Sequence, residues 1–270
     1  MNGTTTVQLA EKTAKAVTGS VEEWTDFLQS AARLYKYSYP EQLLIYAQRP
    51  DATACASYEI WNQTMRRYVR RGARGIALPD GAGAVRYVFD VADTGARKSS
   101  REVKTWVLDE NNREAVAHAL ETQYGSAAKL GIAGQLEEIA MQQSMDYWQW
   151  HQDELRGIVD GSFLEGYDEL NLEIAFRNTA AASVKYMLLS RCNLAREYQI
   201  EPEELAGVLE WNTSAASGAL GSAISELSEG VLRQIERTIR QYERSQNHDE
   251  RTDVYEERRV LDSRSDSSRQ

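Results

Sequence analysis

The chain has only two cysteines, Cys55 and Cys192, among its 270 residues, and it has no long apolar run. A membrane-spanning helix needs about 20 consecutive apolar residues, so no association with a membrane is expected. The N-terminal segment lacks a basic region followed by an apolar stretch, which predicts that no signal peptide is present. Two widely separated cysteines without a signal peptide are typical of free thiols in a reducing compartment, and we expect a cytoplasmic protein.

Histidine is also scarce, and this scarcity bears on catalysis. The three histidines are His118, His151 and His248, and no two of them stand four residues apart as in an HExxH zinc helix. The sequence contains no cysteine–histidine spacing typical of a zinc site and no glycine-rich phosphate loop. We therefore expect no metal, no other cofactor and no catalytic residues.

The net charge of -10 hides a strong asymmetry along the chain. Residues 1–108 hold 15 Lys/Arg and 11 Asp/Glu, whereas residues 109–270 hold 16 and 30. Within residues 31–74 the count is 8 basic against 3 acidic. A site for phosphate groups therefore belongs in the first part of the chain, and the acidic remainder would repel nucleic acid.

The beginning of the chain combines a polar segment with predicted helices. Residues 1–19 are small and polar and are expected to be a flexible N-terminus. Ser20 and Glu23 form a capping-box pattern, and apolar residues at helical spacing follow it, which predicts an amphipathic helix. Pro40 fits the first turn of a second helix, and Ser57 fits the N-cap of a short third one.

Short β-prone runs come next. They lie at 68–69, 75–78, 85–89 and 103–108, with glycines between them, and residues 93–101 have the composition of an exposed hairpin loop. Helices followed by a small antiparallel sheet predict an α+β domain over residues 20–125.

From about residue 112 the pattern is almost wholly helical. Helices are predicted over about 112–123, 134–156, 168–192 and 202–210, and a last one carries apolar residues from Leu220 to Tyr242 at helical spacing. This predicts a mostly α-helical second domain over 126–244. Residues 245–270 are charged and nearly devoid of core residues, and a disordered tail is expected there.

Two clusters interleave cations with aromatic rings. Cations neutralise phosphates and flat rings stack on unpaired bases, so this mixture is typical of single-strand binders. These residues could also have purely structural roles. The tyrosines could pack at the ends of helices, and half of the arginines could lie on the solvated face of a strand without a ligand. The candidate nucleic-acid-binding residues are Arg33, Tyr35, Lys36, Tyr37, Gln42 and Arg49 in the first cluster, Arg66, Arg67, Tyr68, Arg70, Arg71 and Arg74 in the second, and Lys104.

Residues 24–78 resemble a known family at fixed spacings. The shared features are Tyr37-Ser38, Gln42-Leu43-Leu44-Ile45, Gln48-Arg49-Pro50, Ala52-Thr53, Trp61 and the pattern Val69-(x)2-Gly72-(x)2-Gly75-Ile76. This stretch resembles the N-terminal domain of the antirestriction protein ArdC, which also heads large helicase/methylase-like proteins of conjugative elements. The resemblance implies a single-stranded-DNA-binding domain that protects incoming element DNA from restriction in a bacterial host cell.

The second half departs from the ArdC pattern. In that family a zinc-metalloprotease-like domain with an HExxH helix follows, and this chain lacks the motif. Residues 162–243 are nevertheless similar to the matching region of the large mobile-element proteins, at Ser162–Gly166 and Leu188-(x)2-Arg191-Cys192. The second half of the chain is expected to be either a metalloprotease-like scaffold without its metal or an unrelated helical bundle.

The leading hypothesis is a non-enzymatic single-stranded-DNA-binding, antirestriction-type protein of a mobile genetic element or phage. An alternative from another class is a protein-directed inhibitor, in which the acidic helical half binds a host restriction or CRISPR nuclease. A third is a hidden metalloprotease or nuclease, which metal analysis would reveal. The chain fits either the head of a longer protein or a stand-alone form, and its oligomeric state is left open.

Overall fold

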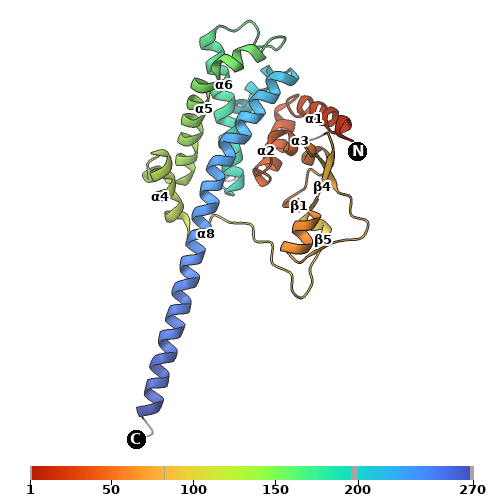
Figure 1. The fold of residues 1–270 in the computed structure, drawn as a ribbon. Helices are drawn as coiled ribbons and strands as arrows, with labels where there is room; N and C mark the ends of the chain where they lie inside the picture. Colours follow the sequence, from red (N-terminus) through yellow and green to blue (C-terminus); the bar gives the residue numbers. More distant parts are fainter. Residues whose placement is uncertain (1, 82, 196–199, 268–270) are drawn as a thin grey trace.

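The computed structural model describes residues 2–81, 83–195 and 200–267, with side chains as far as residue 246. Three N-terminal helices are followed by small antiparallel sheets, and the rest of the described chain is helical. In Figure 1 the sheets lie below α1 (Gly3–Val17), α2 (Val21–Arg33) and α3 (Tyr39–Gln48), on the side away from α4 (Arg113–Tyr124) and α5 (Gly131–Ile158). The α+β class predicted from the sequence is confirmed.

Helix α1 (Gly3–Val17) occupies the segment for which the sequence predicts a flexible N-terminus. The Asn2 side chain caps it by accepting a hydrogen bond from the Thr5 backbone N–H at 2.9 Å. Thr13 is buried and donates its hydroxyl to the Leu9 carbonyl, and Val17 is almost fully buried. Threonine can occupy the buried face because its hydroxyl is bonded to a carbonyl of the preceding turn. The buried face of α1 is therefore not marked by apolar residues at helical spacing.

Helices α2 (Val21–Arg33) and α3 (Tyr39–Gln48) confirm the next two predictions. The Ser20 hydroxyl accepts from the Glu23 backbone N–H at 3.1 Å at the start of α2. Pro40 lies in the first turn of α3, where its fixed φ suits a helix and its missing N–H costs nothing.

A three-stranded antiparallel sheet has the order β1-β4-β3, with β1 at Cys55–Ser57, β4 at Val85–Asp90 and β3 at Ile76–Pro79. The buried side chains of β3 and β4 pack on α3 in a small core of their own. The Gln48 amide closes the free edge of β3, since it accepts from the Ala77 N–H and donates to the Ala77 carbonyl, both at 3.0 Å. Strand β1 was not predicted from the sequence.

A separate two-stranded sheet joins β2 (Tyr68–Val69) to β5 (Thr94–Gly95). The short helical segment η1 (Ile60–Thr64) lies between β1 and β2 and begins just after Ser57, whose hydroxyl accepts from the Ile60 N–H. The segment η2 (Val91–Asp93) connects β4 to β5. The predicted loop over 93–101 therefore begins with a short strand.

Residues 101–109 connect the sheets to α4 and contain neither helix nor strand, so the strand predicted over 103–108 is wrong. Trp106 is buried instead in the main core, and its indole N–H donates to the Tyr35 hydroxyl oxygen at 3.0 Å. Leu108 is buried in the same core. The apolar residues of this connector anchor it against the helices instead of pairing it in a sheet.

The helices predicted over 112–123, 134–156 and 168–192 are confirmed with ends shifted by a few residues. The segment 202–210 is a four-residue α-helix followed by a 3-10 helix, and the last predicted helix begins at Ser214. Trp148 of α5 packs on Phe176 of α6. The ring centres of Phe176 and Trp211 lie 5.8 Å apart. The elements are α4 (Arg113–Tyr124), η3 (Ala128–Leu130), α5 (Gly131–Ile158), α6 (Glu169–Arg191), α7 (Pro202–Leu205), η4 (Ala206–Glu210) and α8 (Ser214–Ser267).

The main hydrophobic core crosses the domain boundary expected near residue 125. The Trp24 indole of α2 donates to the Ser183 hydroxyl of α6 at 3.0 Å. The Tyr39 ring of α3 lies on Gly221 of α8, where a Cβ atom would come within 2.2 Å of the ring. Residues of α2 and α3 thus share one hydrophobic core with the helices that follow residue 125.

Helix α8 continues through Ser267, where the sequence predicts a disordered tail over 245–270. Residues 245–267 contain no proline or glycine, the two residues that most disfavour a helix interior. Figure 1 shows the end of α8 projecting well beyond the other elements. Residues 268–270 lie outside the described chain, within which no helix has an apolar stretch long enough to cross a bilayer.

Candidate nucleic-acid interface

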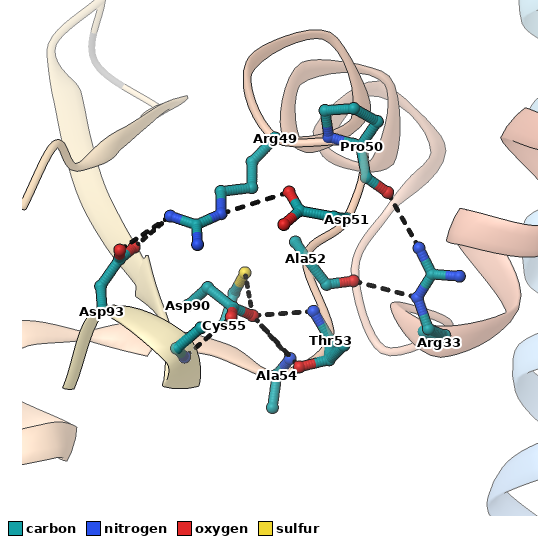
Figure 2. A network of polar contacts seen from close by, with 11 residues as sticks. Arg33, Arg49, Pro50, Asp51, Ala52, Thr53, Ala54, Cys55, Asp90 and Asp93 are labelled. Carbon is teal, nitrogen blue, oxygen red and sulfur yellow. Dashed lines mark hydrogen bonds and ion pairs between the residues drawn. The ribbon is translucent and has the colours of Figure 1, made fainter. Parts of the chain in front are cut away.

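Two arginines of the first predicted cluster hold the loop after α3. The Arg33 guanidinium donates to the carbonyls of Pro50 at 2.9 Å and Ala52 at 3.1 Å, and the Nη1 atom of Arg49 lies 2.7 and 2.8 Å from the two carboxylate oxygens of Asp93 (Figure 2). The hydrogen bond with Asp93 is the main cause that raises the pKa of Arg49. Both guanidinium groups stabilise the fold through these contacts.

The carboxylate of Asp90 holds the same loop from the other side. It accepts from the backbone N–H groups of Thr53 at 2.7 Å and Ala54 at 2.9 Å, and from the Ala92 N–H (Figure 2). The loop between α3 and β1 is therefore fixed on both sides.

Tyr35 and Gln42 of the first cluster are buried, with 3% and 1% of their surface exposed. The Tyr35 hydroxyl donates to the Glu236 carboxylate of α8 at 2.6 Å. The Gln42 amide donates to the Tyr37 carbonyl at 2.9 Å. Neither side chain is accessible to a base in this arrangement, so both are structural here.

Three further candidates are engaged with other groups. Lys36 is half exposed and pairs with Glu236 at 2.5 Å, while Lys104 lies 3.8 Å from Glu102 on the exposed connector. The Tyr37 hydroxyl donates to the Cys55 carbonyl at 2.8 Å, and burial raises its pKa. The first cluster therefore does not form a continuous open surface.

The second cluster is open. Arg66, Arg70, Arg71 and Arg74 are exposed around β2 and the turn at Gly72, and none of them has a side-chain hydrogen bond or ion pair within the described part of the chain. Arg67 differs, because it is partly buried and donates to the Thr94 hydroxyl at 2.8 Å. Four of the predicted arginines thus reach solvent.

Pairing of β2 with β5 brings a second basic segment to the same place. Tyr68 lies opposite Gly95 and Val69 opposite Thr94, and the Arg101 backbone N–H donates to the Met65 carbonyl at 2.9 Å. Arg97, Lys98 and Arg101 follow β5 and are exposed. We call the set of Arg66, Arg70, Arg71, Arg74, Arg97, Lys98 and Arg101 the basic surface.

The two segments that form the basic surface are strongly positive, although Glu102 directly follows Arg101. Residues 65–75 and 95–101 contain eight Lys and Arg and no Asp or Glu. Within the described chain no ion pair involves any of the seven side chains. Such a concentration attracts polyanions, and its effect is screened by salt.

The backbone of Arg66 is held in an unusual conformation, with φ at 54°. Left-handed geometry is disfavoured for a residue with a Cβ, and such positions cluster at functional sites. The Ser100 hydroxyl donates to the Arg66 carbonyl at 2.6 Å and also accepts from the Arg97 N–H. Ser100 therefore ties the two basic segments together.

Two exposed rings adjoin the basic surface. Tyr68 is 40% exposed, lies across Gly95 and has the Arg97 guanidinium 5.5 Å from its ring centre. Tyr87 of β4 is 47% exposed and covers Gly75, the residue after Arg74. A Cβ at Gly95 would lie 2.3 Å from the Tyr68 ring, so the flat approach of this ring requires glycine. Rings that are exposed beside cations suit base stacking.

Sequence reasoning missed part of this surface. Arg97, Lys98 and Arg101 were assigned to an exposed loop but not to the site, although their charge was visible in the sequence. Tyr87 lay in a β-prone run whose exposed face could not be identified without the sheet. The pairing of β2 with β5 brings the segment that holds Arg97, Lys98 and Arg101 next to the second cluster, and this pairing joins segments that are far apart in the sequence.

The histidines lie apart from the basic surface. His118 is exposed on α4, and His151 on α5 stacks on the Tyr147 ring at 4.1 Å. The side chain of His248 lies outside the described residues. Among the residues that are described, no group of three or more His, Cys, Asp or Glu is placed to hold a metal ion.

Comparison of the chain with protein-family models, with curated proteins and with solved structures finds no match.

Proposed function

We propose that the chain is a non-enzymatic single-stranded-DNA-binding protein of the antirestriction type, and that the basic surface is its DNA site. The observation that carries the proposal is a set of seven exposed cations beside Tyr68 and Tyr87, none of which forms an ion pair within the described residues. The cations supply attraction to phosphates, and the rings supply stacking that tolerates any base. The resemblance of residues 24–78 to the ArdC N-terminal domain supports the same activity in a bacterial host.

We place the proposed interface on the basic surface and not on the first cluster. Arg33, Arg49 and Gln42 fix the chain around α3, and Tyr35 is buried against α8. These residues support the sheets on which the basic surface stands. Their part in DNA binding would be indirect.

The test replaces Arg70, Arg71 and Arg74 together by glutamine. These side chains make no contacts that stabilise the described fold, so the variant should fold normally. Loss of three phosphate contacts should weaken binding of a single-stranded oligonucleotide about 100-fold or more at low salt. The measurement is fluorescence anisotropy with a labelled oligonucleotide that carries a 5′-hydroxyl.

A matched control removes three exposed cations from the helical half, by replacing Lys129, Arg237 and Arg244 with glutamine. The change in net charge is the same, so an effect of overall charge would weaken binding equally in both variants. Equal affinity of the two variants would contradict the assignment of the site to the basic surface.

The protein-directed inhibitor differs from this proposal in what it binds. Its partner would be a host restriction or CRISPR nuclease, held by the acidic helical half without DNA. That half shares its core with α2 and α3, so the full chain is the proper reagent. Capture of a purified nuclease in the absence of DNA, unaffected by the change at Arg70, Arg71 and Arg74, would favour the inhibitor.

A further inference from the structure

A cavity of about 510 Å³ lies in the helical half, where α5 and α6 meet α7 and η4. Its volume falls within the range of small-molecule sites, which is about 300–1,000 Å³. We call it the acidic cavity, after the carboxylates that line it. None of its lining residues belongs to the basic surface.

Carboxylates dominate the charge of the acidic cavity. Glu137, Glu203, Glu204 and Glu210 line it, and Lys185 is the one cation among the lining residues, all of which the structure describes. The Lys185 ammonium donates to Glu137 at 2.7 Å and to Glu204 at 3.2 Å, so it ties α5 to α7. The lining therefore has an excess of three negative charges.

The two carboxylates that Lys185 does not reach lack a cation. Glu203 is exposed and has no side-chain hydrogen bond or ion pair within the described chain. Glu210 accepts a hydrogen bond from the neutral Tyr167 hydroxyl at 3.1 Å and forms no ion pair among the described residues. A cationic ligand could therefore bind both without displacing an internal partner.

Thr179 of α6 adds a polar group that lacks a partner. Only 2% of its surface is exposed, it lines the acidic cavity, and its hydroxyl forms no hydrogen bond within the described chain. Threonine in a helix can bond back to the preceding turn, as Thr13 does, but Thr179 does not. A nearly buried hydroxyl without a partner is unfavourable, so a ligand that reaches it gains a hydrogen bond.

Gly207 of η4 keeps the space beside this hydroxyl open. A Cβ atom at Gly207 would come within 2.3 Å of the Thr179 hydroxyl oxygen, and both residues line the acidic cavity. Any larger residue at this position would cover the hydroxyl. The absence of a side chain here therefore leaves the hydroxyl facing the cavity.

Apolar groups complete the lining. Met141 of α5 is exposed, and Ala175, Ala181 and Ala182 of α6 contribute methyl groups. A metal ion gains nothing from such groups, whereas the methylene carbons of an organic ligand bury apolar surface against them. A linear polyamine combines methylene segments with several ammonium groups, each of which donates hydrogen bonds.

We propose that the acidic cavity binds a linear polyamine. Its ammonium groups pair with Glu203 and Glu210, one of them donates to the Thr179 hydroxyl, and its methylene carbons lie on Met141 and the alanines. A lysine side chain of a partner protein carries a single charge and balances the lining less completely. The site shares no residue with the basic surface, so it does not depend on the function proposed above.

The test uses isothermal titration calorimetry on the full chain without DNA, with spermidine, putrescine and Mg²⁺ as separate probes. Putrescine and Mg²⁺ carry the same charge, but only putrescine has methylene groups. We expect saturable binding of spermidine, weaker binding of putrescine and none of Mg²⁺. Absence of saturable spermidine binding would overturn the proposal, and so would equal binding of putrescine and Mg²⁺.

The decisive variant is Thr179→Val, with Thr179→Ser as its control. Valine keeps the shape of threonine, and the lost hydroxyl has no partner in the described chain, so the fold should be retained. Valine should weaken spermidine binding about tenfold, whereas serine, which keeps the hydroxyl, should change it less than about threefold. Urea denaturation checks that both variants are folded. Equal spermidine affinities of the two variants would contradict the site.

Glu203→Gln and Glu22→Gln separate the cavity from the overall charge. Both residues are exposed and both changes remove one negative charge, but Glu22 lies on α2 and does not line the cavity. Glu203→Gln should weaken spermidine binding about threefold or more, and Glu22→Gln should leave it almost unchanged. Equal weakening in the two variants would mean that spermidine responds to net charge alone, which would also overturn the proposal.

Tetralysine tests the other source of ammonium groups. Binding of tetralysine that is tighter than that of spermidine, and is weakened by Thr179→Val, would assign the cavity to a lysine-rich partner and overturn the polyamine. The change at Arg70, Arg71 and Arg74 should leave spermidine binding unchanged, and Thr179→Val should leave DNA binding unchanged. The two proposals therefore fail independently.

Discussion

The carboxylate of Glu236 joins the beginning of the chain to α8, and its replacement by glutamine gives a quantitative test of that junction. It accepts hydrogen bonds from Tyr35 at 2.6 Å and from Lys36 and Arg240 at 2.5 and 2.9 Å. Burial alone would raise the pKa of Glu236, but the hydrogen bonds from these three donors outweigh it and lower the pKa to about 2. The charged form is therefore the one that stabilises the fold.

The expected cost of Glu236→Gln follows from these contacts. Glutamine retains the shape and a hydrogen bond to Tyr35 but loses both ion pairs. Hydrogen bonds to charged groups contribute about 1.5–3 kcal/mol, and both partners, Lys36 and Arg240, are close to half exposed and each contribute less than that. We expect the free energy of unfolding to fall by about 2 kcal/mol near neutral pH. The matched control is Glu229→Gln, which breaks the surface pair with Arg233 and should cost about 0.3–0.5 kcal/mol.

Urea denaturation followed by circular dichroism measures both values, and pH gives a second check. A carboxylate with a lowered pKa stabilises the folded state above its unfolded pKa of 4.5, and this stability is lost as pH falls from there towards about 2. The difference between the wild-type chain and Glu236→Gln should therefore shrink over that interval. A cost no larger than that of Glu229→Gln, or a difference independent of pH, would refute the reasoning.

Two further substitutions test the site and its support. Tyr87→Ala removes an exposed ring beside the basic surface and should weaken single-strand binding by about 1–3 kcal/mol without loss of stability. Fluorescence anisotropy measures the affinity, and urea denaturation measures the stability. Unchanged affinity would mean that Tyr87 is not part of the interface. Trp106→Ala removes the buried anchor of the connector and should lower the free energy of unfolding by about 3–5 kcal/mol, measured by urea denaturation; a cost below about 1 kcal/mol would mean that the ring is not packed as described.

Local sequence rules were sufficient for most of the helices. Ser20 and Pro40 fixed the starts of α2 and α3, because capping and the proline ring act within one turn. Helix α1 was missed because threonines that bond back to the helix take the place of apolar residues. The continuation of α8 was missed because scarce core residues were interpreted as disorder, although that segment contains no proline or glycine.

The candidate site could be predicted only in part, since it depends on long-range packing. The second basic cluster was found from composition, and the structure exposes four of its five arginines. The aromatic residues of the first cluster were chosen for the same chemistry, yet Tyr35 is buried by α8, which lies about 200 residues further along the chain. Arg97 joins the surface through strand pairing, which no local pattern reveals.

The most direct test of the central proposal is the salt dependence of DNA binding by the full chain. Each phosphate that is neutralised on a single strand contributes about -0.7 to the slope of log affinity against log salt, so the seven cations predict a slope of about -5 if all of them engage. DNA binding through the basic surface predicts this steep slope, preference for single strands over duplex, and a slope shallower by about 2 when Arg70, Arg71 and Arg74 are replaced. A slope near zero, or the same slope in that variant, would contradict it.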